Sequence, residues 1–249
     1  MKFSISRESL LSPLSLVAGV VERRQTLPIL SNVLMVLDGE WLSFTATDLE
    51  VELIGRIALP GVEEGIEVTV PARKLVDICK SLPEGAEIDI SAEENKIKLS
   101  SGRSKFTLST LPASEFPSIE DGIGTRQLVL KQAQIRRLID RTGFAMAQQD
   151  VRYYLNGMLL EVVGNRLRVV ATDGHRLAMC SLDLDSNDEV ESQVIIPRKG
   201  VLELARLMSA TGEDDVSIVL SNNHIRATSE QFTFTSKLVD GKFPDYERV

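Results

Sequence analysis

The 249-residue chain contains the same pattern twice, with corresponding positions about 125 residues apart. The paired segments, in chain order, are Phe3-Ser4-Ile5 leading to Leu10 with Leu128-Val129-Leu130 leading to Ile135, Leu30-Ser31-Asn32-Val33-Leu34 with Leu155-Asn156-Gly157-Met158-Leu159, Ala46-Thr47-Asp48 with Ala171-Thr172-Asp173, Val70-Pro71-Ala72-Arg73-Lys74-Leu75 with Ile196-Pro197-Arg198-Lys199-Gly200-Val201, and Phe116-Pro117 with Phe243-Pro244. Chance does not keep such pairs in order at nearly one spacing, so the repeat predicts two similar folding units.

Each copy predicts the same order of secondary structure. A short opening strand, at 2–6 and again at 127–131, precedes a helix with apolar residues at helical spacing. Three strands follow, then a second helix starting at Pro71 or Pro197, because proline suits a first helical turn. Three more strands complete the copy. We therefore expect an α+β fold with two helices on a mainly antiparallel sheet in each domain, at 1–121 and 126–249, joined by a linker at 121–125.

The composition excludes several classes of protein. Hydrophobic residues make up 43% and charged residues 26%, as in ordinary globular domains. No run of 18 apolar residues could cross a membrane, and the start lacks the apolar core of a signal peptide. Cys79 and Cys180 match neither a disulfide framework nor a metal site, and we expect both to be buried. These features favour a cytoplasmic protein.

The charge is unevenly distributed along the chain. The net charge of −8 argues at first against nucleic-acid binding. However, the four predicted helical segments, 7–24, 71–82, 131–142 and 197–208, together carry +8, which leaves −16 for the rest of the chain. Anion binding depends on the local field, so basic helices could hold DNA through its phosphates. The alternative is that these Lys and Arg side chains only keep the outer helix faces hydrated and have no binding role. No base-reading motif is present.

Catalysis is not expected from this sequence. Asp173-Gly174-His175 could be an acid–base pair or a set of metal ligands, but Asp48 holds the same place in the first copy without a histidine. An aspartate that both copies contain is better explained as a turn former that accepts backbone hydrogen bonds. The sequence has no phosphate-binding glycine loop, nucleophile elbow or His-Glu-x-x-His motif. We expect no catalytic residue, no cofactor and no metal.

The chain resembles the bacterial sliding clamps, the β subunits of DNA polymerase III. The segments that carry the resemblance are Thr26-Leu27-Pro28-Ile29-Leu30, Val70-Pro71-Ala72-Arg73-Lys74, Ser109-Thr110-Leu111-Pro112, Gln149-Asp150-Val151-Arg152-Tyr153-Tyr154-Leu155-Asn156-Gly157, Ala171-Thr172-Asp173-Gly174-His175-Arg176-Leu177, Pro197-Arg198-Lys199-Gly200, and Lys237-Leu238-Val239-Asp240-Gly241 with Phe243-Pro244-Asp245-Tyr246. They are spread over the whole chain.

The resemblance implies the DNA-clamp fold and a non-enzymatic role as a processivity factor. In this family three units form a subunit, and two subunits close head-to-tail into a homodimeric ring around double-stranded DNA. The ring slides without sequence specificity, tethers the polymerase III α subunit and other proteins that carry a clamp-binding motif, and is opened by a clamp loader. The third unit of the family is absent from this sequence, so we expect an incomplete partner cleft and no closed ring. A module that only docks peptides is the alternative function.

The resemblance also assigns residues. Its DNA-contacting positions are Arg24, Arg73, Gln149, Tyr153 and Tyr154. Arg23 could replace Arg24 in this role, and the two tyrosines could instead serve packing. Its partner-peptide cleft corresponds to Arg152, Leu155, Thr172, Gly174, His175, Arg176, Leu177, Pro244, Arg248 and Val249. Its dimer interface corresponds to Phe106 and Leu108, on an expected edge strand of the first domain.

Overall fold

The structure is a computed structural model that describes residues 2–21, 27–61, 65–93, 95–119, 124, 126–185 and 191–248. The chain divides into two compact units. Unit 1 comprises Met1–Ile119 with Glu230–Thr233, and unit 2 comprises Glu120–Ser229 with Phe234–Val249. Apart from Gly124, the predicted linker at 121–125 lies outside the described residues.

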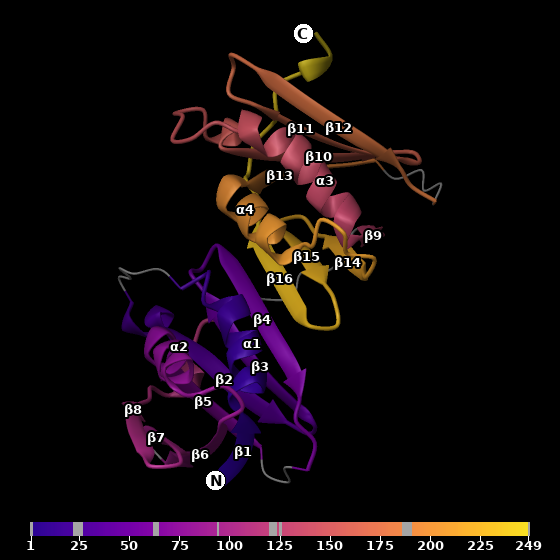
Figure 1. The fold of residues 1–249 in the computed structure, drawn as a ribbon. Helices are drawn as coiled ribbons and strands as arrows, with labels where there is room; N and C mark the ends of the chain where they lie inside the picture. Colours follow the sequence, from indigo (N-terminus) through magenta and orange to yellow (C-terminus); the bar gives the residue numbers. More distant parts are fainter. Residues whose placement is uncertain are drawn as a thin grey trace. The chain divides into compact units, whose positions relative to one another are not determined.

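Within the described residues, unit 1 contains a short opening strand, a helix, four strands, a second helix and three more strands (Figure 1). Its strands form two antiparallel ladders, in the orders β1-β6-β7-β8 and β5-β2-β3-β4. The elements are β1 (Lys2–Ser6), α1 (Arg7–Val17), η1 (Pro28–Ser31), β2 (Asn32–Asp38), β3 (Trp41–Thr47), β4 (Val51–Ala58), β5 (Ile66–Pro71), α2 (Ala72–Ser81), β6 (Glu87–Glu93), β7 (Lys96–Ser101), β8 (Ser104–Ser109) and η2 (Ala113–Glu115).

Unit 2 repeats this arrangement (Figure 1). Its ladders run in the orders β9-β14-β15-β16 and β13-β10-β11-β12. The elements are β9 (Arg126–Lys131), α3 (Gln132–Thr142), η3 (Gly143–Ala145), η4 (Tyr153–Leu155), β10 (Gly157–Val163), β11 (Arg166–Thr172), β12 (Leu177–Asp183), β13 (Ser192–Pro197), α4 (Arg198–Leu207), β14 (Asp215–Leu220), β15 (His224–Thr228), β16 (Phe232–Lys237) and η5 (Tyr246–Arg248). The predicted α+β class and the structural repeat are therefore confirmed.

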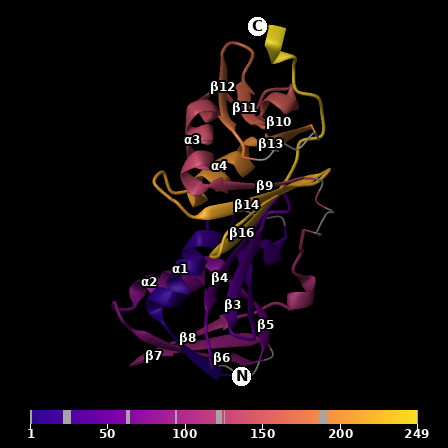
Figure 2. The same ribbon diagram turned by 90° about the vertical axis from the view of Figure 1, so that its right-hand side faces the viewer.

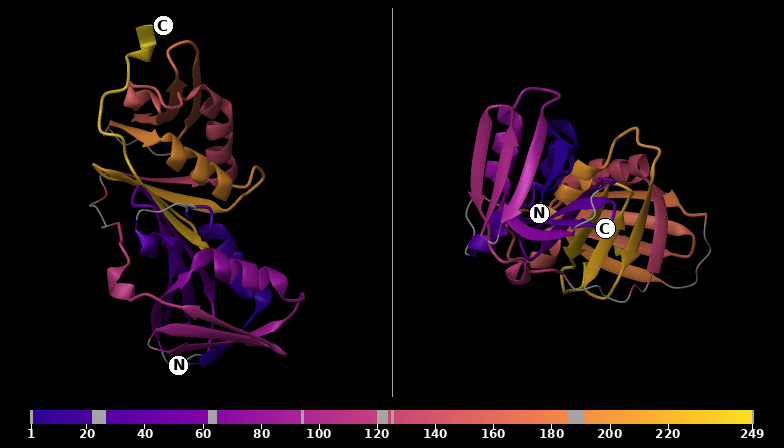
Figure 3. Two further views of the ribbon diagram at one scale, coloured as in Figure 1. Left: turned by 90° about the vertical axis from the view of Figure 1, so that its left-hand side faces the viewer. Right: turned by 90° about the horizontal axis from the view of Figure 1, so that it is seen from below.

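Apolar periodicity places the helices. In α1, Leu10, Leu14 and Val17 are fully buried, and the helix packs on β3 and β4. The side chain of Ser6 caps α1 by accepting the backbone N–H of Ser9 at 3.2 Å. Helix α2 packs on β2 and β5 beside α1, and α3 and α4 occupy the corresponding places in unit 2. Figures 2 and 3 show the two helices of each unit lying next to one another.

The structure corrects three details of the sequence prediction. Four strands rather than three separate the two helices of each unit. The additional strands are β5 and β13, which continue directly into the following helix. Consequently Pro71 and Pro197 are the last residues of these strands, and α2 and α4 begin one residue later. Helix α1 ends at Val17 and carries one cation and one acid, so it is neutral rather than basic.

Candidate functional site

A turn of the same design joins two strands in both units. In unit 1, Asp48 Oδ1 accepts the backbone N–H groups of Glu50 and Val51 at 2.9 and 2.7 Å. The hydroxyl of Thr47 accepts the N–H of Leu49 at 3.0 Å and donates to the carbonyl of Val51. The carboxylate and hydroxyl thus replace the ladder bonds that the chain loses where it reverses.

Unit 2 builds the corresponding turn from Thr172 and Asp173. Asp173 Oδ1 accepts the N–H groups of His175 and Arg176 at 3.0 and 3.1 Å, and Thr172 Oγ1 accepts from Gly174 at 3.1 Å. These backbone bonds hold the pKa of Asp173 below its usual value. The interpretation of Asp48 and Asp173 as turn formers is confirmed. Leu49 and Gly174 occupy the same place in the two turns, with φ of +78° and +86°.

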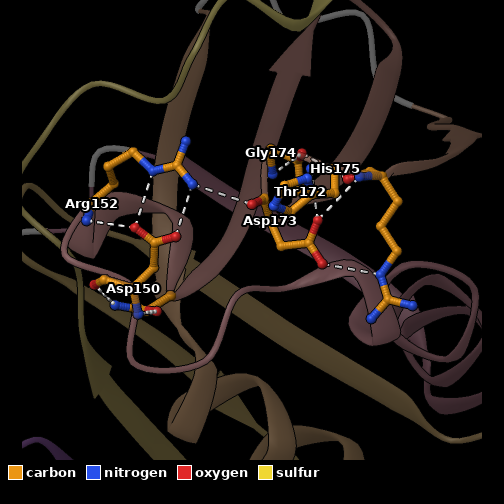
Figure 4. A network of polar contacts seen from close by, with 8 residues as sticks. Asp150, Arg152, Thr172, Asp173, Gly174 and His175 are labelled. Atoms are coloured by element: carbon orange, nitrogen blue, oxygen red, sulfur yellow. Dashed lines mark hydrogen bonds and ion pairs between the residues drawn. The ribbon is translucent and has the colours of Figure 1, made fainter.

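Arg152 connects this turn to the loop that precedes β10 (Figure 4). Its guanidinium donates to both carboxylate oxygens of Asp150, at 3.0 and 2.8 Å, and to the carbonyl of Asp173 at 3.3 Å. The bidentate pair lowers the pKa of Asp150 to about 2, because Arg152 stabilises the ionised carboxylate. Two segments about twenty residues apart are thereby joined through one side chain.

The same loop is closed by Asn156. Its Oδ1 accepts the backbone N–H of Asp150 at 2.9 Å, and its Nδ2 donates to the Asp150 carbonyl at 2.8 Å. Gln149, at the exposed bend before this closure, has φ of +58°, in the left-handed region that costs an ordinary residue free energy. The surrounding hydrogen bonds therefore hold the Gln149 backbone in a shape that it would not adopt by itself.

The other residues that the resemblance assigns to DNA contact lie in different settings. Tyr153 is 57% exposed, and Tyr154 is partly buried against the apolar cluster of Leu159, Val170, Ile195 and Phe243. The two tyrosine rings meet edge to face at 5.7 Å. In unit 1, Arg73 is exposed in the first turn of α2 and donates to the carbonyl of Val21 at 3.3 Å. Arg23 and Arg24 lie outside the described residues.

The turn residues assigned to the cleft come together on one surface of unit 2. Gly174, His175, Arg176 and Leu177 are exposed, and Thr172 is half-buried. Arg176 donates to Asp173 at 3.1 Å and to the carbonyl of Phe144 at 2.8 Å, and its guanidinium lies 5.5 Å from the centre of the Phe144 ring. A hollow of about 450 Å³ lies beside them, lined by Phe144, Met146, Ala147, Gln148, Gln149, Asp150, Asp173, His175, Arg176 and Arg198.

Three further cleft positions lie elsewhere in unit 2. Leu155 is only 2% exposed, so its side chain belongs to the packed interior. Pro244 and Arg248 are exposed near the end of the chain, where Arg248 forms an ion pair with Asp245 at 2.6 Å. Val249 lies outside the described residues.

In unit 1, Phe106 and Leu108 lie on β8, an end strand of the β1-β6-β7-β8 ladder, as expected. Leu108 is buried, whereas Phe106 is half-buried. The edge of a strand offers backbone groups to another chain, which is the property that an interface through this strand requires.

The remaining helices carry the positive charge that the sequence indicates. Each of α2, α3 and α4 has three cations and one acid within its observed bounds. Some cations are bound locally: Arg136 pairs with Asp140 and Arg206 with Glu203, each at 2.9 Å. In contrast, Arg137 and Arg141 are exposed and form no ion pair with another described residue.

The titratable groups of the described residues bear on whether a metal site or a reactive thiol is present. The described residues contain no cluster of His, Cys, Asp and Glu that could hold a metal ion. Burial raises the pKa of the Cys79 thiol to about 11, which keeps it protonated and unreactive. Cys79 is buried as predicted, whereas Cys180 is half-buried on β12, so that prediction was wrong. No helix within the described ranges is both long enough and apolar enough to cross a bilayer.

Sequence reasoning missed three residues of this surface. Phe144 provides the face on which Arg176 lies, and Asn156 closes the Gln149 loop. Arg198 was counted only as a helix charge, but its guanidinium donates to the carbonyl of Met146 at 3.3 Å. Of these three residues, only Asn156 could have been identified from the sequence, because asparagine side chains commonly form hydrogen bonds with nearby backbone groups.

Two like units, each with paired helices on antiparallel sheets, and net positive charge on α2, α3 and α4 are features of the class of DNA sliding clamps. The comparisons with known proteins agree with this class. The sequence model for the N-terminal domain of the DNA polymerase III beta subunit matches residues 1–120, and the model for its central domain matches residues 129–245.

Individual relatives match along the whole chain. The beta sliding clamp of Pseudomonas aeruginosa is 66% identical over 249 residues, which is 68% of its own length, and that of Escherichia coli is 52% identical over the same span. The crystal structure of the P. aeruginosa DNA polymerase III subunit beta superposes with a TM-score of 0.96 at 65% identity, covering all of this chain and 67% of that one. The chain belongs to the beta sliding clamp family, and its role is that of a DNA polymerase III sliding clamp.

Proposed function

We propose that the protein encircles duplex DNA without reading its sequence and tethers the replicative polymerase to the template. It does so in the cytoplasm and performs no reaction of its own. Its partners are double-stranded DNA, the polymerase III α subunit, other proteins with a clamp-binding motif, and the clamp loader. Clamp domain 1 corresponds to residues 1–121 and clamp domain 2 to residues 126–249.

The observation that carries this proposal is the separation of charge within each unit. Helices α2, α3 and α4 carry net positive charge although the whole chain carries −8. Lysine and arginine contacts to phosphate position DNA but contain no sequence information. Weak contacts of this kind hold a duplex while allowing it to move past the protein.

Within this function we assign DNA contact to Arg24, Arg73, Gln149, Tyr153 and Tyr154. Arg73 has the most direct physical support, because the first turn of a helix adds free backbone N–H groups to the arginine charge. The shape of the Gln149 loop is fixed by Asn156 and the Asp150–Arg152 pair, so the backbone that carries Gln149 is ordered before DNA arrives.

We assign partner-peptide docking to the surface around the Thr172–Leu177 turn and the end of the chain. Exposed Leu177 offers an apolar contact beside the polar His175 and Arg176, as a short peptide with large anchoring side chains requires. A P. aeruginosa clamp, 66% identical to this chain, has been solved bound to griselimycin. We propose that this compound also binds the present protein. We also propose that Phe106 and Leu108 form part of a homodimer interface.

A titration with duplex DNA tests the central proposal. We expect two unrelated duplex sequences to bind with the same affinity, and that affinity to fall steeply as salt increases. Affinity that differs strongly between sequences would contradict non-specific contact. If no duplex binds while a clamp-binding peptide does, and the peptide affinity is insensitive to salt, the protein is a peptide-docking module instead.

A further inference from the structure

The chain segment Phe243–Arg248, here called the C-terminal segment, lies on one face of the β13-β10-β11-β12 ladder. Phe243 is 4% exposed and forms an apolar cluster with Leu159, Val170 and Ile195, which come from three strands of that ladder. Tyr246, three residues further along the segment, packs against the same cluster. Two aromatic side chains thus hold the segment, with Pro244 between them.

The hydroxyl of Tyr246 is also bound by two charged residues. It donates to Oε2 of Glu161 at 2.6 Å and accepts from Nη1 of Arg168 at 2.7 Å. Since a guanidinium can only donate and a carboxylate only accept, both bonds have a fixed direction. Arg168 also reaches Glu247 at 3.1 Å, which adds a second point of attachment in the segment.

The sheet itself orients these two charged residues. Glu161 on β10 lies directly opposite Arg168 on β11. Gln193, on the neighbouring β13, donates to the second carboxylate oxygen of Glu161 at 3.3 Å. The exposed fractions of the Glu161 and Arg168 side chains are only 16% and 24%, so water screens these bonds less than it screens the surface ion pairs.

The surface proposed for peptide docking borders the same face. Val170 lies opposite Met179 and Thr172 opposite Leu177 in the β11–β12 register. Side chains directly opposite in an antiparallel pair share one face, so Leu177 and Met179 lie on the face that the C-terminal segment crosses. Their exposed fractions are 38% and 55%, which leaves apolar surface beside the segment.

We propose that Glu161 and Arg168 are positioning residues for the partner-peptide cleft: they act through Tyr246 to hold the C-terminal segment against the sheet, and so determine where Pro244 and Arg248 meet a bound peptide. This inference rests on the cleft proposed above. Neither charged residue needs to touch the peptide. Their effect comes from the fraction of molecules in which the segment is docked.

The test uses Tyr246→Phe, which removes the hydroxyl and keeps the ring that packs on the cluster. We expect a fluorescein-labelled peptide with a clamp-binding motif to bind about three- to tenfold more weakly, because hydrogen bonds to charged groups are lost and the docked fraction falls. Amide hydrogen exchange in residues 243–248 should accelerate, while exchange in β14 stays unchanged. Arg168→Lys, which loses the guanidinium that reaches Tyr246 and Glu247, should also weaken peptide binding. Arg166→Lys is its matched control and should bind peptide as the unchanged protein does, because Arg166 lies two residues earlier on β11 and its one ion pair among the described residues is with the exposed Asp183.

Conservative variants separate positioning from a general loss of structure. Glu161→Gln keeps an acceptor for the Tyr246 hydroxyl, so its peptide affinity should lie between those of the unchanged protein and Glu161→Ala. Combining Tyr246→Phe with Glu161→Gln should add little beyond the stronger single effect, because both act on one bond. Full additivity of the two changes would overturn the inference.

Leu177→Ala distinguishes failure of this inference from failure of the proposed cleft. If Leu177→Ala weakens peptide binding but Tyr246→Phe leaves both binding and hydrogen exchange unchanged, the positioning role is wrong and the cleft stands. If Leu177→Ala leaves peptide binding unchanged, the cleft itself is misplaced, and the inference falls with it.

Discussion

Removing two cations from α3 should reduce the salt dependence of DNA binding by a predictable amount. Arg137 and Arg141 are one helical turn apart on the same exposed face, and neither forms an ion pair with a described residue. Each phosphate contact contributes about 0.9 to the slope of log affinity against log salt. The double variant Arg137→Ala/Arg141→Ala should therefore lower the magnitude of that slope by about 1.8 if both residues contact phosphate.

The effect is large enough to measure by fluorescence anisotropy of a labelled duplex. Between roughly 50 and 200 mM salt, the unchanged protein should lose about twelvefold more affinity than the variant. The matched control is Lys96→Ala/Lys98→Ala, which removes the same charge from β7, where both lysines pair with Glu93. An identical slope for the α3 variant and the unchanged protein, or an equal reduction in the β7 control, would refute the argument that the helices provide the DNA-binding surface.

Two further predictions concern the joined loop and turn of unit 2. Gly174→Ala should lower the free energy of unfolding, measured by urea denaturation, by about 1 kcal/mol. The reason is that φ of residue 174 is +86° and the added Cβ would lie 3.0 Å from Nη1 of Arg152. An unchanged free energy of unfolding would show that the turn relaxes freely. The carboxyl of Asp150 should titrate at about 2, below its ordinary 3.8, so the bond to Arg152 stabilises the fold above pH 3.8 and is lost as pH falls through about 2. Arg152→Ala should return the carbon-13 NMR midpoint of Asp150 toward 3.8, and a midpoint that stays near 2 would show that backbone bonds suffice.

Much of the fold could be predicted because the sequence contains an internal repeat. The 125-residue spacing predicts two units of one topology, and the shared Thr-Asp pair predicts a turn in both. The fourth strand between the helices was missed because β5 meets α2 without an intervening loop. Pro71 marks the start of the helix but leaves no gap that would separate a strand from it.

The polar network around the site could not be predicted in the same way. The bond between Tyr246 and Glu161 joins residues 85 positions apart, and nothing in the local sequence pattern pairs them. Likewise, the helical spacing of apolar residues suggested that the first helix continues to residue 24, although it ends at Val17. Val20 and Val21 are buried although they lie beyond the end of the helix, so apolar residues at helical spacing do not require that the helix continues there.

The paired turns have a consequence for how one copy of a duplicated domain can acquire a new task. Their shape depends on a threonine and an aspartate, and the tip tolerates leucine in one copy and glycine in the other. The bonds that reverse the chain use these two side chains and backbone groups, so the side chains after the tip can change without removing them. One copy has histidine and arginine at the two positions after the tip, where its sibling has glutamate and valine, and the same turn forms in both.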